Sequence, residues 1–181
     1  NSMRIISNAS GSWADNLTVA TGGGPALNTW SHIAWVRKGE TMIIFKNGAI
    51  VAMGTTFASF NFTNPSNLGI IGRFNEGTNI REFNGYIDEL RVSKGVARYN
   101  VDFTPATAPF SDPVITLSEK FADKTTLLMH MNGSNGSTTF TDSSPNQVAI
   151  TAVGSAQIST AQSKFGGSSL LLNGTTDHLT L

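Results

Sequence analysis

The 181-residue chain contains no cysteine, and only 13% of its residues are charged. The absence of thiols excludes disulfides, thiolate metal sites and cysteine nucleophiles. The formal net charge is zero, whereas nucleic acid binding and electrostatic attachment to a membrane both require a basic surface. No apolar run approaches the length of a membrane span. We therefore expect no nucleic acid partner and no membrane insertion.

Short apolar runs separated by turn-forming residues dominate the rest of the sequence. Asn47-Gly48 lies between the apolar runs 42–45 and 49–53, and this dipeptide favours a hairpin because both residues of a type I′ turn need positive φ. A weak helix candidate occurs near 160–164. Further strands are predicted at 31–38, 68–74, 84–93, 125–131, 147–153, 169–173 and 178–181. The pattern predicts an all-β antiparallel sandwich.

The run 84–93 alternates like a single strand and carries two adjacent acids, Asp88 and Glu89. Adjacent residues of a strand point to opposite faces. These acids therefore cannot flank one glycosidic bond as a catalytic carboxylate pair does. His32 lies in an apolar run, where a structural role is more common than general base catalysis. No nucleophile or phosphate-loop motif occurs, and we expect no enzymatic activity.

Three groups of motifs stand out along the chain. They are W-S-H-I-A-W-V-R-K-G at 30–39 with F-K-N-G at 45–48, then G-Y-I-D-E-L-R-V-S-K-G-V-A-R-Y at 85–99 with F-T-P at 103–105, and finally L-L-M-H-M-N-G-S-N-G-S-T-T-F-T-D-S-S-P-N at 127–146 with K-F-G-G-S-S-L-L-L-N-G-T-T-D-H-L at 164–179. Together they resemble the laminin-G-like jelly rolls of the concanavalin A-like lectin/glucanase superfamily. The resemblance implies an antiparallel jelly-roll sandwich, of the tandem-repeat kind seen in tailed-phage structural proteins.

The order of these motifs departs from that family. In the family, the 127–146 stretch looks like the start of a domain, and the 85–99 stretch looks like its end. Residues 1–112 then form the C-terminal part of one jelly roll. A proline-containing connector occupies 113–124, beginning near residue 100, and 125–181 form the N-terminal part of a following or permuted jelly roll. The connector favours a tandem array, and a circularly permuted domain made of both parts is the alternative.

No cofactor is required, but a structural calcium ion is one interpretation of the acids. In the resembled family, acids of the opening loop and of the late I-D-E strand can share calcium, which nominates Asp142, Asp88 and Asn146. Calcium takes about six to eight oxygen ligands. The alternative is that Asp142 and Asp177 cap turns through local hydrogen bonds, and that Asp88 pairs with an arginine. The sequence leaves both interpretations open.

Carbohydrate is a second candidate ligand, since sugar faces stack on aromatic rings and amides bond sugar hydroxyls. Trp13, in the polar stretch S-G-S-W-A-D-N, is the first candidate platform. Asn75 and Tyr99 are further candidates for ligand binding. Trp30 and Trp35 lie beside or within an apolar run and are interpreted as core residues.

These observations predict a non-enzymatic structural or adhesion module of a virion or cell-surface protein that recognises surface glycans. Its expected partners are copies of itself, neighbouring repeats or other virion proteins, because repeated weak sites gain avidity. Its expected location is the virion or the extracellular surface of a cell. A carbohydrate-binding module of a secreted bacterial enzyme is the alternative, and a degenerate glycan hydrolase or lyase is the third hypothesis.

Overall fold

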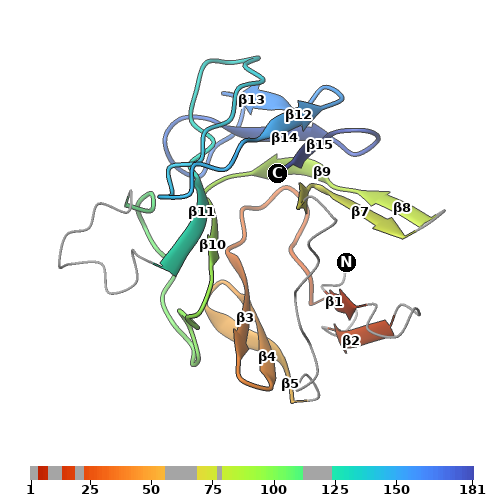
Figure 1. Ribbon diagram of the computed structural model, residues 1–181, viewed down its shortest axis with the longest axis vertical. Helices are drawn as coiled ribbons and strands as arrows, with labels where there is room; N and C mark the ends of the chain where they lie inside the picture. Colours follow the sequence, from red (N-terminus) through yellow and green to blue (C-terminus); the bar gives the residue numbers. More distant parts are fainter. Residues whose placement is uncertain (1–3, 8–13, 19–22, 56–68, 77–78, 112–123) are drawn as a thin grey trace. The chain divides into compact units, whose positions relative to one another are not determined.

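The computed structural model describes residues 4–7, 14–18, 23–55, 69–76, 79–111 and 124–181. These residues form the strands β1 to β15, and every pairing between them is antiparallel (Figure 1). The described part of the chain contains no helix long and apolar enough to cross a membrane. The stretch near 160–164 is not helical. The predicted all-β antiparallel fold class is confirmed.

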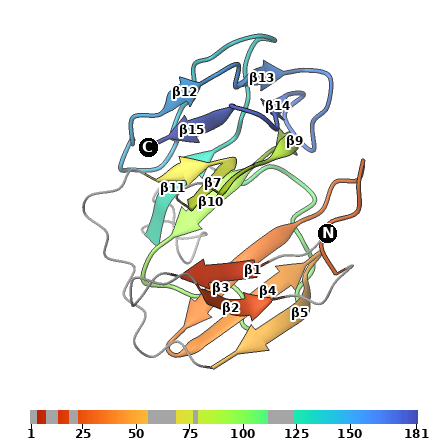
Figure 2. The same ribbon diagram turned by 90° about the vertical axis from the view of Figure 1, so that its right-hand side faces the viewer.

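The chain divides into two compact units, which are described separately. Unit 1 comprises Asn1–Thr63 and Val96–Ala106, and unit 2 comprises Asn64–Gly95 and Thr107–Leu181. The described strands of unit 1 are β1 (Arg4–Ser7), β2 (Ala14–Thr18), β3 (Ile33–Lys38), β4 (Thr41–Lys46) and β5 (Ala49–Gly54). β1 pairs with β2, and β4 lies between β3 and β5 in a second sheet (Figure 2).

The Asn-Gly hairpin is confirmed. Asn47 and Gly48 connect β4 to β5 with φ values of 52° and 84°, which a type I′ turn requires at both positions. The side-chain oxygen of Asn47 accepts a hydrogen bond from the backbone N–H of His32 at 2.9 Å. A Cβ at position 48 would clash with the carbonyl oxygen of Phe103, so glycine is required by close packing as well as by φ.

One face of the β3–β4–β5 sheet is covered by an aromatic cluster. The rings of Tyr99 and Phe103 stack with centroids 3.6 Å apart, and Phe45 packs edge-on against both rings. His32 also makes edge contacts with Tyr99 and Phe103. Phe45 has no exposed surface, so this cluster is the core of unit 1 on that face.

The expectation that Trp35 is a core residue is wrong, since 56% of its surface is exposed. Trp35 lies on β3, at the end of the three-stranded sheet, opposite Ile44 on the central strand. Ile44 is fully buried. Val36, the next residue on the same strand, points to the opposite face and is buried with Phe45, Tyr99 and Phe103, so the exposure of Trp35 follows from its face of the sheet.

Unit 2 contains ten described strands in four small sheets. The strands are β6 (Ile70–Ile71), β7 (Arg73–Glu76), β8 (Asn79–Glu82), β9 (Asn84–Ile87), β10 (Leu90–Ser93), β11 (Thr125–Met129), β12 (Thr151–Val153), β13 (Gln157–Ser159), β14 (Ser169–Asn173) and β15 (His178–Thr180). The sheet orders are β12-β15-β6, β13-β14-β9, β10-β11 and β7-β8. The predicted run 68–74 is divided into β6 and β7 at Gly72, whose φ is 91°.

Strands from the two sides of the predicted connector pair with one another in unit 2. β6 pairs with β15, β9 with β14, and β10 with β11. The core that these pairings enclose consists of Leu127, Met129, Met131, Phe140, Ala156, Ile158, Leu170, Leu172 and Leu179. Partly buried residues of the earlier segment, Ile71, Ile87 and Leu90, pack against this core. The core of unit 2 therefore depends on both segments.

The interpretation of 84–93 as one strand is wrong. The strand breaks after Ile87, and β10 begins at Leu90. Glu89 has a φ of 51°, a left-handed conformation that costs of the order of 1–2 kcal/mol for a residue other than glycine. The break transfers the chain from the β13-β14-β9 sheet to the β10-β11 sheet, and it places Asp88 and Glu89 at the junction.

Candidate functional site

Asp88 holds a turn that is distant in the sequence. One of its carboxylate oxygens accepts hydrogen bonds from the backbone N–H groups of Lys164 and Phe165 at 2.7 and 2.9 Å. The other oxygen is buried and accepts no hydrogen bond. Burial raises the pKa of the Asp88 carboxyl and the charge of Glu89 adds to this, while backbone N–H groups, chiefly those of Phe165 and Lys164, only partly oppose it. The donors to Asp88 are backbone amides rather than the expected arginine.

Glu89 reaches different partners. Its carboxylate oxygens lie 2.9 and 3.0 Å from Nδ1 of His130, and one of them accepts the backbone N–H of Phe110 at 2.8 Å. The Glu89 side chain is only 5% exposed and that of His130 17%. Because an ionised carboxylate only accepts hydrogen bonds, Nδ1 carries the hydrogen of this contact. The pair fixes the orientation of the imidazole ring.

These contacts bring the separate motifs of the chain together. The I-D-E-L stretch binds the K-F-G-G stretch through Asp88 and the M-H-M-N stretch through Glu89. The hydroxyl of Ser168 adds a further link, because it donates to the carbonyl of Met131 at 3.1 Å and accepts from the N–H of Gly133 at 3.1 Å. The motif residues thus serve as connections that hold one region of unit 2 in place.

Asp142 organises the loop that follows β11. One oxygen accepts the N–H groups of Leu128 and Ser144, and the other accepts the N–H of Val148 and the hydroxyl of Ser144, all at 2.8–2.9 Å. Burial by itself would raise the pKa of Asp142, but these hydrogen bonds outweigh it and lower the pKa below its ordinary value. The carboxylate is only 6% exposed and has a structural role.

Asp177 has a similar role at the turn after β14. Its oxygens accept the N–H of Ser155 at 2.6 Å and the N–H of Asn173 at 3.1 Å. The expectation that Asp142 and Asp177 cap turns is confirmed.

The predicted calcium ligands already have other partners. Asp142 and Asn146 lie in one turn, joined through the Ser144 hydroxyl, and the Asn146 amide donates to the carbonyl of Thr126 at 3.0 Å. Asp88 lies instead at the β9–β10 junction. Within the described ranges, no three or more His, Cys, Asp or Glu residues gather as a metal site would require. Both oxygens of Asp142 accept hydrogen bonds that a calcium ion would have to replace. Calcium binding by Asp88, Asp142 and Asn146 stays a prediction.

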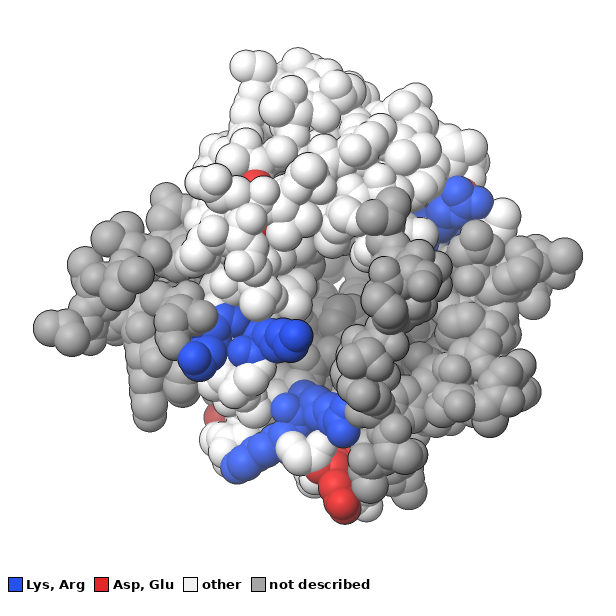
Figure 3. All heavy atoms as spheres, viewed as in Figure 1, with Lys and Arg blue, Asp and Glu red and all other residues white. Residues whose placement is uncertain are grey.

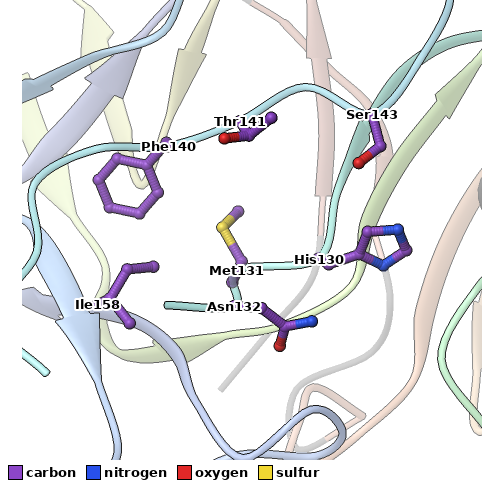
Figure 4. Close-up of a pocket in the computed structure, with 7 residues that line it drawn as sticks. All are labelled: His130, Met131, Asn132, Phe140, Thr141, Ser143 and Ile158. Carbon is purple, nitrogen blue, oxygen red and sulfur yellow. The ribbon is translucent and has the colours of Figure 1, made fainter. Parts of the chain in front are cut away.

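An open pocket lies beside His130 and has a volume of about 130 Å³. Its floor is apolar and buried, and its rim is polar. The floor consists of Met131, Phe140 and Ile158, and the rim consists of His130, Asn132, Thr141 and Ser143. Figure 4 shows Phe140 and Ile158 on one side of Met131, and His130 and Ser143 on the other. A ligand with one apolar end and one hydrogen-bonding end would match this division.

The pocket is built on a strained backbone. Met131 has a φ of 58° although it is only 4% exposed. A buried residue in this conformation persists only where the surroundings hold it, and such residues cluster at functional sites. Ser168 holds the Met131 carbonyl, and the neighbouring Asn132 packs so closely on Gly166 that a Cβ there would clash. These contacts constrain the chain at Met131 and Asn132, beside the pocket.

The residues predicted to bind sugar are not part of this pocket. Trp13 lies outside the described residues. Asn75 belongs to β7, where its backbone pairs with Ile80 of β8. Tyr99 is stacked on Phe103 in the core of unit 1. Ligand binding by these three residues stays a prediction.

Sequence reasoning missed the pocket residues, although Thr139-Phe140-Thr141 contains a signal that could have found them. An apolar residue between two polar ones indicates one side chain in the core and two at the surface. The contact of Phe140 with Met131 and Ile158, however, joins residues that are distant in the sequence.

Comparison of the sequence with models of known protein families identifies the family of the chain. A family model described as the concanavalin A-like lectin/glucanases superfamily, Laminin_G_3, matches residues 1–98. The chain belongs to this family. No curated protein and no solved structure matches it. The match to the Laminin_G_3 family extends over β1 to β10, while β11, β14 and β15, the partners of β10, β9 and β6, lie beyond it.

Membership of the Laminin_G_3 family indicates a carbohydrate-binding or adhesion kind of module. Laminin-G-like domains of the lectin type are generally non-catalytic. In this chain Asp88 and Glu89 bind different segments and do not face each other as the two carboxylates of a glycosidase do. The expected reason, alternation within one strand, does not apply, because β9 ends at Ile87.

Proposed function

We propose that the chain is a non-enzymatic adhesion module of a virion or cell-surface protein, and that it recognises surface glycans. The pocket at His130 carries this proposal, because it combines a buried apolar floor with an exposed polar rim. Ligand sites in general are concave and largely apolar, with a few polar groups that fix orientation. The lectin-like family of the chain supports the same function.

All residues that line the pocket belong to 125–181, and the low charge of this segment supports a neutral ligand. The nearest carboxylate outside it is that of Glu89, which is buried and bonded to His130. Residues 125–181 contain only Asp142, Lys164 and Asp177 as formally charged residues at pH 7 when histidine is neutral. The two acids are buried and engaged in hydrogen bonds. Figure 3 shows that the part of the surface that carries β12 to β15 in Figure 1 is almost free of charged side chains on the face in view. Neutral glycans fit such a surface better than anionic ones.

The test is a binding screen of the purified chain against a panel of neutral and anionic oligosaccharides. We expect weak binding to neutral members, and no release of reducing sugar from any of them. Thr141→Trp should fill the pocket from its exposed rim and abolish binding. Thr139→Trp is the matched control, because Thr139 is exposed and does not line the pocket. Binding to no glycan, or equal loss in both variants, would contradict the proposal.

We also propose that 69–95 and 125–181 form one folding unit, so that segments on the two sides of the connector complete each other within one chain, as the permuted alternative requires for its two parts. The pairings β6–β15, β9–β14 and β10–β11 support this proposal. Light scattering of the purified chain tests it against the tandem organisation. A folded monomer is expected if the two segments complete each other within one chain. A chain that folds only in an oligomer would favour complementation between repeats.

The weakness of a small site makes multiple copies useful. Several modules on one surface convert the later binding events into intramolecular ones and raise the overall avidity. Adhesion by a virion or cell-surface protein therefore requires many copies rather than tight single sites. Glycan-coated beads should capture a chemically linked tetramer of the chain at concentrations where the monomer is not retained.

A further inference from the structure

The size of the pocket at His130 limits which part of a glycan can enter. An apolar cavity of about 150 Å³ holds one benzene molecule, and this pocket has a volume of about 130 Å³. A whole pyranose ring with its hydroxyl groups is larger than benzene. Only a substituent of the sugar can therefore be accommodated fully.

The chemistry of the floor restricts the substituent further. Met131, Phe140 and Ile158 are at most 9% exposed and their side chains offer no strong hydrogen-bonding partner. A sugar hydroxyl placed against them would lose its bonds to water without replacement, which is unfavourable. A methyl group placed there would gain contact with all three side chains.

The rim requires the opposite chemistry. Asn132 offers amide donors and an acceptor, and Thr141 and Ser143 offer hydroxyls. These groups line the same pocket as the apolar floor, and Figure 4 shows Thr141 and Ser143 on the chain segment that continues from Phe140. A group that enters should therefore carry both a donor and an acceptor directly beside its apolar end.

We propose that this pocket binds the acetamido group of an N-acetylated amino sugar. The methyl group lies on the Met131–Phe140–Ile158 floor, and the amide N–H and carbonyl bond to the rim. The sugar ring remains outside, at the mouth of the pocket. This inference rests on the proposed glycan-binding function and names the sugar class that the site selects.

The experiment compares methyl glycosides that differ only in this group. The probes are the methyl β-glycosides of N-acetylglucosamine, of glucose and of N-butanoylglucosamine, and binding to the full chain is followed by saturation-transfer difference NMR. We expect the acetyl compound to bind at least about tenfold more tightly than the other two. Its acetyl methyl protons should receive the strongest saturation, because they are the protons in closest contact with the floor.

Variants connect this preference to the pocket. Thr141→Trp should remove binding of the acetyl compound, and Thr139→Trp should leave it unchanged. Asn132→Ala should weaken binding while the acetyl methyl protons remain the most saturated, because it removes a rim partner and leaves the floor intact.

The two proposals fail in different ways. Equal binding of the glucose and N-acetylglucosamine compounds, or saturation spread evenly over the ring protons, would overturn the acetamido assignment and leave glycan binding standing. Absence of binding to every glycan of the larger panel would overturn the proposed function itself. Binding that survives Thr141→Trp would place the sugar elsewhere on the chain and overturn the assignment of this pocket.

Discussion

Asp142 and Asp88 are two acids of unit 2 that both accept backbone amides, yet folding moves their pKa values in opposite directions. Asp142 receives four hydrogen bonds on two oxygens, and its pKa is lowered. Asp88 receives two on one oxygen and leaves the other buried without a hydrogen bond, and its pKa is raised. The comparison teaches that burial alone does not decide the role of a carboxylate, because the number of hydrogen bonds that compensate the lost water decides it.

The contrast extends to the pocket. The loop held by Asp142 also carries Phe140, Thr141 and Ser143. A fully bonded carboxylate beside them keeps this segment in one conformation, so the rim is arranged before binding and less entropy is lost on binding. In this loop, the buried and fully hydrogen-bonded Asp142 stabilises the conformation, and the neighbouring Thr141 and Ser143 are available to contact a ligand.

The largest effect is expected from Asp142→Ala. The substitution leaves the buried amide groups of the loop without acceptors, at about 1–3 kcal/mol each, and we expect unfolding to become easier by about 3 kcal/mol. Denaturant titration should show a lower midpoint with an unchanged slope. Asp102→Ala is the control, because Asp102 is exposed and accepts one N–H, from Ile50. If Asp142→Ala lowers the free energy of unfolding no more than Asp102→Ala does, the structural role of Asp142 is contradicted.

The next effect concerns pH. Because the folded pKa of Asp142 lies below its unfolded value, the unfolded state binds more protons in that range. The stability contributed by Asp142 is therefore complete above its ordinary pKa near 3.8, and it is lost as the pH falls through the lower folded value. Asp142→Asn should be less stable at neutral pH and should show a flatter acid limb. An unchanged acid limb in thermal melts between neutral and acidic pH would contradict this role.

A smaller effect of opposite sign is expected at Asp88. Its raised folded pKa means that the folded state binds more protons just above the ordinary value of 3.8. This term therefore favours folding at low pH and is lost as the pH rises through the folded pKa. Asp88→Asn keeps an oxygen for the two amides and removes the buried charge, so we expect a change within about 1 kcal/mol at pH 7. Destabilisation as large as that of Asp142→Ala in the same titration would show that the two acids are equivalent.

Calcium should change the stability least, and its effect tests the same difference between Asp142 and Asp88. Both oxygens of Asp142 are occupied by hydrogen bonds, whereas Asp88 has one oxygen without any. Any rise in melting temperature with millimolar calcium should be below about 2 °C, which for a chain of this length is below about 1 kcal/mol. Chelation should reverse the rise, and Asp88→Asn should abolish it. A larger rise that persists in Asp88→Asn would mean that the ion binds elsewhere.

Local sequence signals predicted much of the strand content. Asn47-Gly48 predicted a tight turn because both residues readily adopt positive φ, and the structure has that turn. The runs at 125–131, 169–173 and 178–181 correspond to β11, β14 and β15. The failures came where neighbours in space decide. Alternation over 84–93 gave no sign that Glu89 would adopt a left-handed conformation or that its side chain would bond to the distant His130 and Phe110.

The sequence by itself determined the all-β class and the absence of disulfides, and it offered the turn-capping roles of Asp142 and Asp177 as one of two interpretations. The first two follow from composition and local pattern, whereas the hydrogen bonds of the two acids also reach Leu128 and Ser155, which are 14 and 22 residues away. Only the tertiary structure decided the pairing of strands across the connector, the exposure of Trp35 and the formation of the pocket at His130. Each of these depends on which distant segments pack together, and burial and long-range hydrogen bonding are properties of that packing rather than of any local run of residues.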